Sequence, residues 1–331
     1  MLNLTDRIEL LEKLGTYMNS AEPGWTAAQK KAAGKNAWFI PSFISLAVTN
    51  ITHHFLQKDA LDAWSHHYDI KDNPAPKNVG IIMAGNIPLV GFHDFLCAFV
   101  SGHRQTIKLS SKDDVLLRHL IEKLEEWAPA TASLIQTSDL LKGCDAYIAT
   151  GSNNSSRYFE YYFRKYPHII RKNRTSVAVL NGAETRVELE RLADDVYTYF
   201  GMGCRNVTQV FVPEGYDFLP MLDAFRKYDF LAENHKYKHN YDYGLALLII
   251  NQQYYMTNDS IILSENSVPF SPVSQLHYQF YSKMDDVYRQ LNPEDIQCIT
   301  GTGKVPFGAA QSPGLYDYAD GVDTMKFLTG F

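Results

Sequence analysis

The chain has 331 residues, of which 45% are hydrophobic and 21% charged, so it can form about two domains with sizeable cores. Its formal net charge of −6 argues against a general nucleic-acid binder, which is usually basic. Four cysteines are too few for a disulfide scaffold of this size.

The apolar runs predict neither a signal peptide nor a membrane span. Asp6, Arg7 and Glu9 place charges where a signal peptide needs an apolar stretch. The longest apolar candidate, Leu245 to Ile250, is the size of a strand, whereas a membrane-spanning helix needs roughly 18 residues. We therefore expect a cytoplasmic protein whose four thiols are free.

The first part of the chain predicts helices. Residues 1–20 and 26–66 carry apolar residues at helical spacing, with an interruption at Pro41. The segment 72–76 contains two prolines and predicts a connection to a different kind of structure.

From residue 79 the pattern alternates between short apolar runs and amphipathic segments. Strands are expected at residues 79–84, 105–109, 145–149 and 176–180. Helices are expected at residues 87–100 and 112–127, and in an aromatic segment that follows a Gly-Ser turn at 151–152. Such alternation is typical of βαβ units and a mostly parallel sheet.

The second half predicts a further α/β unit. Residues 184–200 form a helical pattern, and residues 207–212 and 244–251 are expected to be strands. The last segment, 301–331, is rich in glycine and is expected to be mostly loop. No flexible linker marks the boundary, which we place near residues 175–183.

Cys204 is the cysteine whose surroundings best suit chemistry. It stands in Phe200-Gly-Met-Gly-Cys-Arg-Asn206, between a predicted helix and a predicted strand. The glycines allow a sharp turn or a close approach to a ligand, and Arg205 favours the thiolate form. The alternative is a buried cysteine in a tight turn. Cys97, among Phe95, Leu96 and Phe99, is expected to lie in the core.

Other polar motifs admit structural interpretations. Asn86 follows a strand, where an amide can donate to an oxyanion or merely cap a helix. The segment 150–156 suits a phosphate at a helix N-terminus or an ordinary helix cap. Gly301 to Lys304 fails the P-loop pattern, and the His235 and His239 pair lacks a zinc motif, so no metal site is expected.

In this order, Gly85-Asn-Ile-Pro88, Lys108-Leu-Ser-Ser-Lys112, Gly151-Ser152 and Cys204 resemble the aldehyde dehydrogenase superfamily. Within it, the sequence is most similar to LuxC-type acyl-CoA reductases, above all in Gly85 to Asp113 and Gly203 to Asn206. The resemblance spans about residues 78 to 275.

The resemblance implies both the fold and the catalytic residues. It implies an aldehyde dehydrogenase-like α/β fold, with a Rossmann-like cofactor domain, a smaller α/β catalytic domain, and the active site in the cleft between them. Cys204 matches the superfamily nucleophile. Asn86 matches the asparagine that forms the oxyanion hole together with the backbone N–H of the nucleophile.

The resemblance also implies a nicotinamide cofactor. The matched residues are Lys108, Ser111 and Lys112 beside the adenosine ribose, Gly151 and Ser152 at the phosphates, and Phe270 near the nicotinamide. NAD-preferring relatives commonly carry Glu where this chain has Ser111, and that carboxylate would repel a 2′-phosphate. We therefore expect NADP(H) to be favoured over NAD(H).

Two departures from the superfamily suggest which acyl acceptor is used. The stretch Ile170 to Arg174 has no carboxylate where hydrolytic relatives carry their Glu base. In the superfamily a second Glu usually precedes the segment that matches Phe270, and this chain has Val268 at that position. Glu265 is close in the sequence but does not align with that Glu. Without a base to activate water, exchange with coenzyme A is the more sensible chemistry. The expected reaction is NADPH-dependent reduction of an acyl-CoA thioester to an aldehyde.

The expected domains are residues 1–178 with the N-terminal helices and NAD(P)-binding domain, 179–305 as the catalytic domain, and 306–331 as a segment that crosses back to the cofactor domain or to a partner subunit. The expected partners are a small-molecule acyl thioester or an acyl-carrying protein, in a homo-oligomer. Two alternatives stay open: an NAD(P)-dependent aldehyde dehydrogenase, and a non-catalytic binding protein that keeps the fold.

Overall fold

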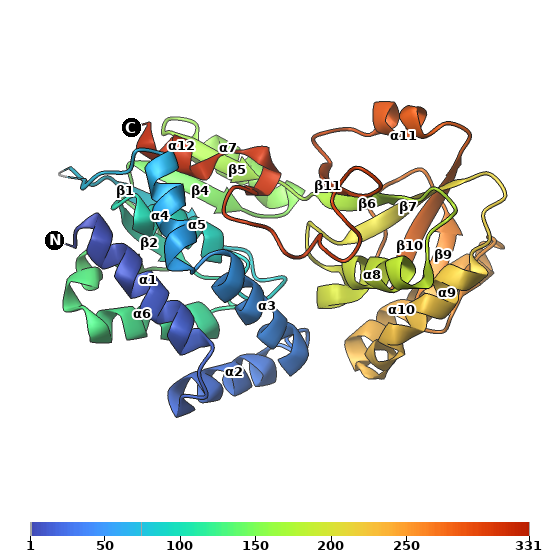
Figure 1. The fold of residues 1–331 in the computed structure, drawn as a ribbon, viewed down its shortest axis with the longest axis horizontal. Coiled ribbons are helices and arrows are strands. Elements are labelled where there is room, and N and C mark those ends of the chain that lie inside the picture. The colour runs from blue at the N-terminus through green and yellow to red at the C-terminus, as the bar shows by residue number, and fades with distance from the viewer. Residues whose placement is uncertain (1, 74, 331) are drawn as a thin grey trace. The chain divides into compact units, whose positions relative to one another are not determined.

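The computed structural model describes residues 2–73 and 75–330, and the chain divides into two compact units (Figure 1). Unit 1 contains the chain up to Asn173 and again from Pro313 onward, and unit 2 is Arg174–Ser312. The strand Thr175–Val179, which the expected boundary at residue 178 divides, belongs wholly to unit 2.

Four helices open unit 1: α1 (Leu4–Met18), α2 (Pro23–Lys35), α3 (Pro41–His54) and α4 (Lys58–His67). A capping box between Asn3 and Asp6 begins α1. Pro23 and Pro41 each stand at the start of a helix, where a missing N–H costs no hydrogen bond. Pro41 therefore separates two helices, as its position in the sequence indicates.

The sheet of unit 1 has five parallel strands in the order β3-β2-β1-β4-β5. Their bounds are β1 (Asn78–Ile82), β2 (Arg104–Lys108), β3 (Ile135–Thr137), β4 (Ala146–Thr150) and β5 (His168–Arg171). Ile81 of β1 pairs with Ile107 of β2 and Ile148 of β4, and all three are fully buried. Such continuous apolar strands are typical of a parallel sheet covered on both faces.

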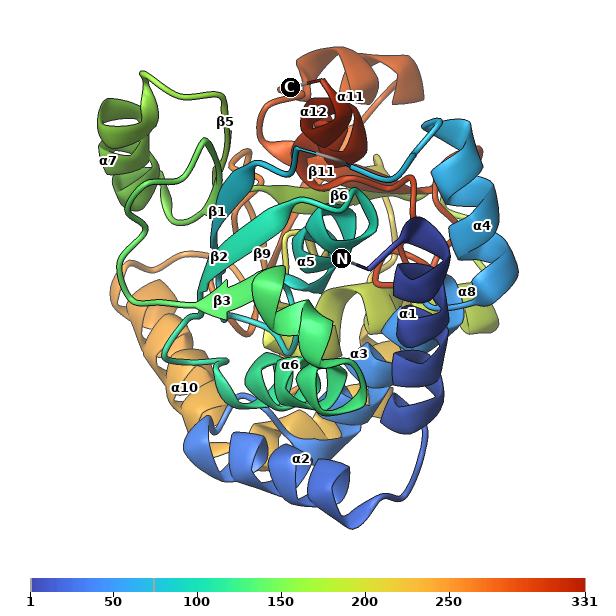
Figure 2. The ribbon, with the colours of Figure 1, turned by 90° about the vertical axis from the view of Figure 1, so that its left-hand side faces the viewer.

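The helices between the strands of unit 1 include α5 (Phe92–Val100), α6 (Val115–Trp127) and α7 (Asn153–Phe163). The α5 helix is apolar nearly all round because it contacts β1 and β2 as well as α1 (Figure 2). The expected helix from residue 87 was wrong in its first turn. Pro88 disfavours helical backbone at Ile87, and Leu89 has a φ of 57°.

The order of the strands creates a switch point between β1 and β4. The chain runs from β1 outward to β2 and β3, and then crosses to β4 and β5 on the other side of β1. The loops that leave β1 and β4 therefore part in opposite directions at the carboxyl edge. Open α/β sheets bind their ligands at this point.

The C-terminal segment of unit 1 contains a 3₁₀ turn (Ala319–Gly321) and α12 (Thr324–Thr329). Arg171 of β5, which is 3% exposed, donates to the Ala319 carbonyl at 2.8 Å, to Thr324 Oγ1 at 2.9 Å and to Asp94 Oδ1 at 2.5 Å. The buried His103 ring contacts the Leu328 carbonyl at 2.9 Å through Nε2. These contacts fasten the last residues to the sheet and to α5.

Unit 2 has a six-stranded sheet in the order β11-β6-β7-β10-β9-β8, which is parallel except for β8. The strands are β6 (Thr175–Val179), β7 (Val207–Pro213), β8 (Met256–Thr257), β9 (Ile262–Glu265), β10 (Gln275–Tyr281) and β11 (Ile296–Gly301). The helices are α8 (Arg186–Tyr197), α9 (Leu219–Phe225), α10 (His235–Ile250) and α11 (Met284–Gln290). Most of this second α/β unit agrees with the sequence pattern.

The strand expected at residues 244–251 was wrong, because these residues end the α10 helix. Asn234 caps α10, and its buried residues Tyr237, Tyr241, Gly244 and Leu248 follow helical spacing. The apolar run at residues 245–250 is only the last part of a longer helix. A short apolar run does not by itself distinguish a strand from a helix.

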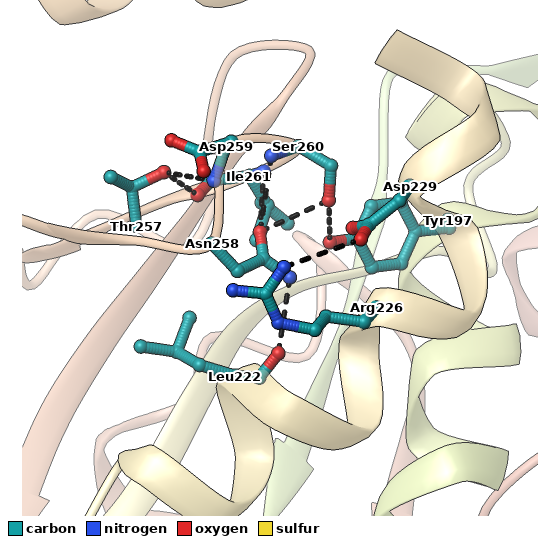
Figure 3. Close-up of polar contacts among 9 residues, drawn as sticks. All are labelled: Tyr197, Leu222, Arg226, Asp229, Thr257, Asn258, Asp259, Ser260 and Ile261. Carbon is teal, nitrogen blue, oxygen red and sulfur yellow. Dashed lines mark hydrogen bonds and ion pairs between the residues drawn. The ribbon is translucent and has the colours of Figure 1, made fainter.

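A buried polar network joins the helices of unit 2 to the turn before β9 (Figure 3). The side-chain oxygen of Asn258 accepts from the backbone N–H groups of Ser260 and Ile261. The side-chain NH₂ group of Asn258 donates to the Leu222 carbonyl of α9 at 3.1 Å. The Ser260 hydroxyl lies 2.8 Å from the Tyr197 hydroxyl at the end of α8. Asn258 therefore connects the turn with both helices.

We predict that Arg171→Ala lowers the free energy of unfolding of unit 1 by about 3 kcal/mol, because it leaves the Asp94 carboxylate buried without its cation. Hydrogen exchange should increase in residues 319–329, which lose their contacts with Arg171. Chemical denaturation and exchange mass spectrometry measure the two effects.

Lys172→Ala is the matched control for Arg171→Ala. Lys172 pairs with Glu160, and the two side chains are 56% and 50% exposed. This exposed pair should contribute less than about 1 kcal/mol. Equal effects of the two variants would contradict the assignment of Arg171 as the anchor of the C-terminal segment.

Candidate functional site

Three segments singled out in the sequence follow neighbouring strands at the carboxyl edge of unit 1. Asn86 follows β1, Lys108 ends β2, and Gly151 and Ser152 follow β4. Because β2, β1 and β4 are adjacent and parallel, their carboxyl ends lie along one edge. The segments after β1 and β4 flank the switch point. The sheet thus brings these predicted residues to one place within unit 1.

The turn that carries Asn86 packs tightly on the turn after β2. Gly85 is buried, and a Cβ on it would lie 2.5 Å from Ser110 Oγ and 3.2 Å from the Asp113 backbone nitrogen. Only glycine allows this approach without displacing the neighbouring turn. Leu89 has a φ of 57°, and its backbone N–H donates to Asp113 Oδ2 at 2.7 Å. Asn86 itself is exposed on this supported turn.

The side chains of Lys108, Ser111 and Lys112 are accessible at the end of β2. All three residues are exposed, whereas Asp113 beside them is buried. The Lys112 backbone is fixed by hydrogen bonds from its N–H to Ser110 Oγ at 3.3 Å and from the Asn36 amide to its carbonyl at 3.2 Å. The segment therefore presents two cations and a hydroxyl from an ordered turn.

Gly151 and Ser152 form the start of α7. Ser152 is the N-cap, and its hydroxyl accepts from the Ser155 backbone N–H at 3.3 Å. A Cβ on Gly151 would approach Phe159 and Ser155 to 2.9 Å, so the helix packs directly against this glycine. Both interpretations of this segment, a helix cap and a phosphate site, are compatible with this geometry.

Cys204 lies in unit 2, in a turn immediately before the amino end of β7. The turn is entered through three successive residues of left-handed backbone, with φ values of 55° at Tyr199, 58° at Phe200 and 73° at Gly201. Left-handed backbone is unfavourable for bulky residues and clusters at functional sites. Cys204 is partly exposed.

Asn206 holds the turn around Cys204. Its side chain has no exposed surface; Oδ1 accepts from the Gly203 N–H at 2.7 Å. Its amide donates to the carbonyls of Asp195, Val196 and Thr198, at 3.0, 3.2 and 2.8 Å. One buried side chain thus satisfies carbonyls at the end of α8 and fixes the backbone before Cys204.

Ser176 of β6 connects Cys204 with a second thiol. Its hydroxyl donates to the Cys204 carbonyl at 3.0 Å, accepts from the Cys298 N–H at 3.1 Å, and lies 3.1 Å from Cys298 Sγ. Either group can donate in the contact between Ser176 Oγ and Cys298 Sγ, and Ser176 thus holds Cys298 against β6.

Phe270 lies in the loop between β9 and β10, and this loop is tied to the same end of β7 as Cys204. The Thr208 hydroxyl donates to the Pro269 carbonyl, and the His277 ring contacts the Val268 carbonyl at 2.6 Å through Nδ1. Burial lowers the pKa of His277. Phe270 lines a cavity of about 570 Å³, together with side chains of α10 and β10.

The two places where the family resemblance implies a hydrolytic base hold other groups. Arg171, inside the stretch 170–174, is committed to Asp94 and the C-terminal segment of unit 1. Val268 is 50% exposed, and Glu265 is exposed at the end of β9.

The two remaining cysteines are structural. Cys97 and Cys144 are buried, and burial raises the pKa of each thiol, that of Cys97 to well above its ordinary value. The expectation that Cys97 lies in the core is confirmed. Among the four cysteines, Cys204 and Cys298 alone are partly exposed.

Sequence reasoning missed three supporting residues. Asn206 and Asp113 lie at the ends of the segments that carry the family resemblance, but their roles depend on burial. Ser176 depends on the pairing of β6 with β11, which joins residues far apart in the chain. The one local signal was that Asp113 directly follows Lys112 and that Asn206 lies two residues after Cys204.

The comparison with family models decides the family. The model described as acyl-CoA reductase (LuxC) matches residues 46–219, just over half of the chain. The chain belongs to the LuxC family of acyl-CoA reductases. The match includes Asn86, Lys108, Gly151 and Cys204, and the predicted resemblance is confirmed. No curated protein matches the sequence.

Solved aldehyde dehydrogenases have the same fold. The Physcomitrella patens enzyme in complex with succinate aligns with a TM-score of 0.68 at 11% identity, over 90% of this chain and 73% of that one. The NAD-dependent enzyme of Sinorhizobium meliloti gives 0.66 at 11% identity, over 93% and 72%. The NAD⁺ complex from Bacillus cereus gives 0.63 at 12% identity, over 90% and 72%. The expected aldehyde dehydrogenase-like α/β fold is confirmed.

The LuxC protein is therefore an oxidoreductase that acts on aldehyde or acyl groups, and its family implies a nicotinamide cofactor. Within residues 2–73 and 75–330, every helix is too short or too polar to cross a bilayer. In the same residues, no cluster of three or more His, Cys, Asp or Glu side chains is arranged to hold a metal ion.

We predict that a small alkylating reagent modifies Cys204 first, Cys298 second, and Cys97 and Cys144 only on unfolding. Cys204 and Cys298 are partly exposed, but the Ser176 hydroxyl lies 3.1 Å from Cys298 Sγ and restricts its approach to a reagent. Peptide mass spectrometry after timed labelling of the native protein measures the order.

Ser176→Ala provides the internal control, since it removes the hydroxyl that contacts Cys298 Sγ. Labelling of Cys298 should accelerate in this variant, while Cys97 and Cys144 remain protected. Labelling of Cys298 before Cys204 in the parent protein would contradict the proposed order.

Proposed function

We propose that this LuxC protein reduces an acyl-CoA thioester to an aldehyde with NADPH, through an acyl-enzyme on Cys204. The observation that carries the proposal is the Cys204 turn. A partly exposed thiol follows three residues of left-handed backbone, in a turn whose Gly203 N–H donates to the buried side chain of Asn206. Rigid support of this kind suits a nucleophile that must be positioned for attack.

In the proposed first stage, the Cys204 thiolate attacks the thioester carbonyl carbon. A carbon–sulfur bond to Cys204 forms, the bond to coenzyme A breaks, and coenzyme A leaves as a thiolate that takes a proton from solvent. In the second stage, the carbon–sulfur bond to Cys204 breaks as the aldehyde leaves, and the Cys204 thiolate is regenerated. Reduced nicotinamide, when bound, supplies the hydride for this reduction.

The Asn86 side chain is proposed as a donor to the oxyanion in both stages. Support comes from its exposure on a turn whose backbone is held by Gly85 and Asp113. An oxyanion donor must be preorganised, since reorientation during the reaction would cost free energy. The backbone N–H of Cys204 is the second proposed donor.

The carboxyl edge of unit 1 fits a dinucleotide. Lys108, Ser111 and Lys112 present exposed donors at the end of β2, beside the loop that leaves the switch point at β1. Ser152 and the first N–H groups of α7 follow β4 on the other side of that point. These groups would hold the ribose and phosphates, with Phe270 of unit 2 proposed near the nicotinamide.

Coenzyme A is the proposed acyl partner because the hydrolytic base is missing. The stretch 170–174 contains no carboxylate, and Arg171 within it is engaged with Asp94. An acyl-enzyme that cannot activate water persists until it is reduced or returns its acyl group to a thiol.

We predict that acyl-CoA without cofactor releases about one equivalent of coenzyme A per active site, and that Cys204→Ala abolishes this release. Asn86→Ala should lower the rate of acylation by about a hundred- to a thousandfold, as for the loss of one oxyanion donor. Rapid-quench measurement of coenzyme A and mass spectrometry of the acylated peptide check both statements.

The matched control for Cys204 is Cys298→Ala, which should keep stoichiometric acylation. Acylation that persists in Cys204→Ala and maps to another cysteine would refute the assignment of the nucleophile. Continuous release of coenzyme A together with free acid would show that another group activates water.

We predict that NADPH binds more tightly than NADH and that added salt weakens this preference. Ser111 can donate to a 2′-phosphate, and Lys108 and Lys112 add positive charge. Ser111→Glu should raise the dissociation constant of NADPH and change that of NADH less, because a carboxylate repels the extra phosphate. Cofactor fluorescence titration measures both constants.

Ser110→Ala tests whether the effect depends on charge at residue 111 alone. Ser110 lies against Gly85, so its variant changes the turn without adding a carboxylate. Equal affinities of the parent protein for NADPH and NADH at low salt would refute the preference.

A further inference from the structure

Asp113 is a buried carboxyl group whose surroundings the proposed reaction does not yet explain. The residue is 8% exposed and lies just before α6. Its neighbour Asp114 is the N-cap residue of α6, and the Asp114 side chain makes no capping hydrogen bond. Asp113 instead reaches across to the turn after β1, where Oδ2 accepts from the Leu89 N–H at 2.7 Å.

The other oxygen of Asp113 is unsatisfied. Oδ1 is buried and has no hydrogen-bond partner among the described residues. A buried polar atom without a partner is costly, so its retention calls for an explanation beyond packing. The oxygen that is satisfied holds Leu89 in left-handed backbone, with a φ of 57°. Leu89 lies three residues after Asn86 on the same turn.

The Asp113 turn also packs directly against the Asn86 turn. The space that a Cβ of Gly85 would need is occupied by Ser110 and by the Asp113 backbone nitrogen. The Asp113 N–H donates to the Ser110 carbonyl at 3.0 Å, which closes the turn. The two turns are therefore packed against each other, and the contact between Asp113 and Leu89 is the hydrogen bond that links them.

We propose that Asp113 is a positioning residue for the oxyanion donor, and that its ionised form holds the Asn86 turn in the reactive conformation. The inference rests on the proposed function, because it assigns Asn86 to the oxyanion. A carboxylate accepts the Leu89 N–H more strongly than a neutral carboxyl group does. Protonation of Asp113 therefore loosens the turn and slows acylation.

The surroundings of Asp113 place its ionisation near neutral pH. Its pKa is raised to about 7, mainly by burial; the Leu89 N–H lowers it, and the nearby Asp114 carboxylate adds a smaller increase. Asp114 is itself paired with Lys35 of α2 at 2.6 Å. Residues 84–91 contain no titratable side chain, and from the end of α2 Asn36 donates to the Lys112 carbonyl. The carboxylate is the minor form below pH 7 and the major form above it.

The test compares the parent protein with Asp113→Asn, Asp113→Ala and the control Asp114→Asn. In the parent, the rate of Cys204 acylation by acyl-CoA should contain a component that rises as the pH passes through about 7. Asp113→Asn keeps an acceptor for Leu89 but cannot ionise, so this component should be absent and the rate should stay near the parent's low-pH value. Asp114→Asn should keep the component.

Asp113→Ala removes the acceptor altogether. Its kcat should fall about tenfold or more, with little change in KM, since misplacement of a catalytic group affects the reacting state. The Leu89 amide should exchange its hydrogen faster in this variant. In the parent protein, the protection of this amide relative to its intrinsic exchange rate should fall as the pH is lowered. This measurement follows the turn without depending on activity.

The outcomes separate the two proposals. A pH component retained in Asp113→Asn, or unchanged exchange at Leu89 in Asp113→Ala, would overturn the role of Asp113 even if the enzyme is active. Failure of Asn86→Ala to slow acylation would overturn the assignment of Asn86, and the role of Asp113 in catalysis with it. The proposal would be supported if the pH component is lost in Asp113→Asn but kept in Asp114→Asn, and if the Leu89 amide exchanges faster in Asp113→Ala.

Discussion

The requirement that buried polar atoms find partners shapes both turns on which the proposed chemistry depends. Asn206 satisfies it completely, because its amide and its carbonyl oxygen bind four backbone groups around Cys204. Asp113 satisfies it only in part, with one oxygen on Leu89 and the other without a partner. A fully satisfied network is rigid, and the Asn206 network is also insensitive to pH because an amide does not ionise. A half-satisfied carboxyl group leaves its turn sensitive to protonation.

The elements that the sequence predicted well are those whose pattern is local. Strands β1, β4 and β6 are short, mainly apolar runs, and the parallel order of β2, β1 and β4 places the three unit 1 segments at one edge. The α10 helix was misread because its apolar end looks like a strand by itself. Its identity depends on the Asn234 cap and on Tyr237 and Tyr241, which lie outside that run.

The supporting residues of the site were harder to predict, because their roles come from pairing over long distances in the chain. Ser176 matters only since β11 pairs with β6 and brings Cys298 beside it. The stretch 170–174 was noted for its missing carboxylate, but the role of Arg171 within it comes from its contacts with Asp94 and with the C-terminal segment. A sequence motif indicates which residues meet a substrate. The residues that hold them are defined by tertiary contacts.

The glycines of the unit 1 segments illustrate this difference. From the sequence, a glycine at a strand end allows the backbone to approach a ligand. In the structure, Gly85 gives room to Ser110, and Gly151 gives room to Ser155 and Phe159. Both glycines are thus required by contacts within the protein, whether or not a ligand is bound. In the proposed cofactor site, the groups left for recognition are therefore the exposed ones, among them the cations of Lys108 and Lys112.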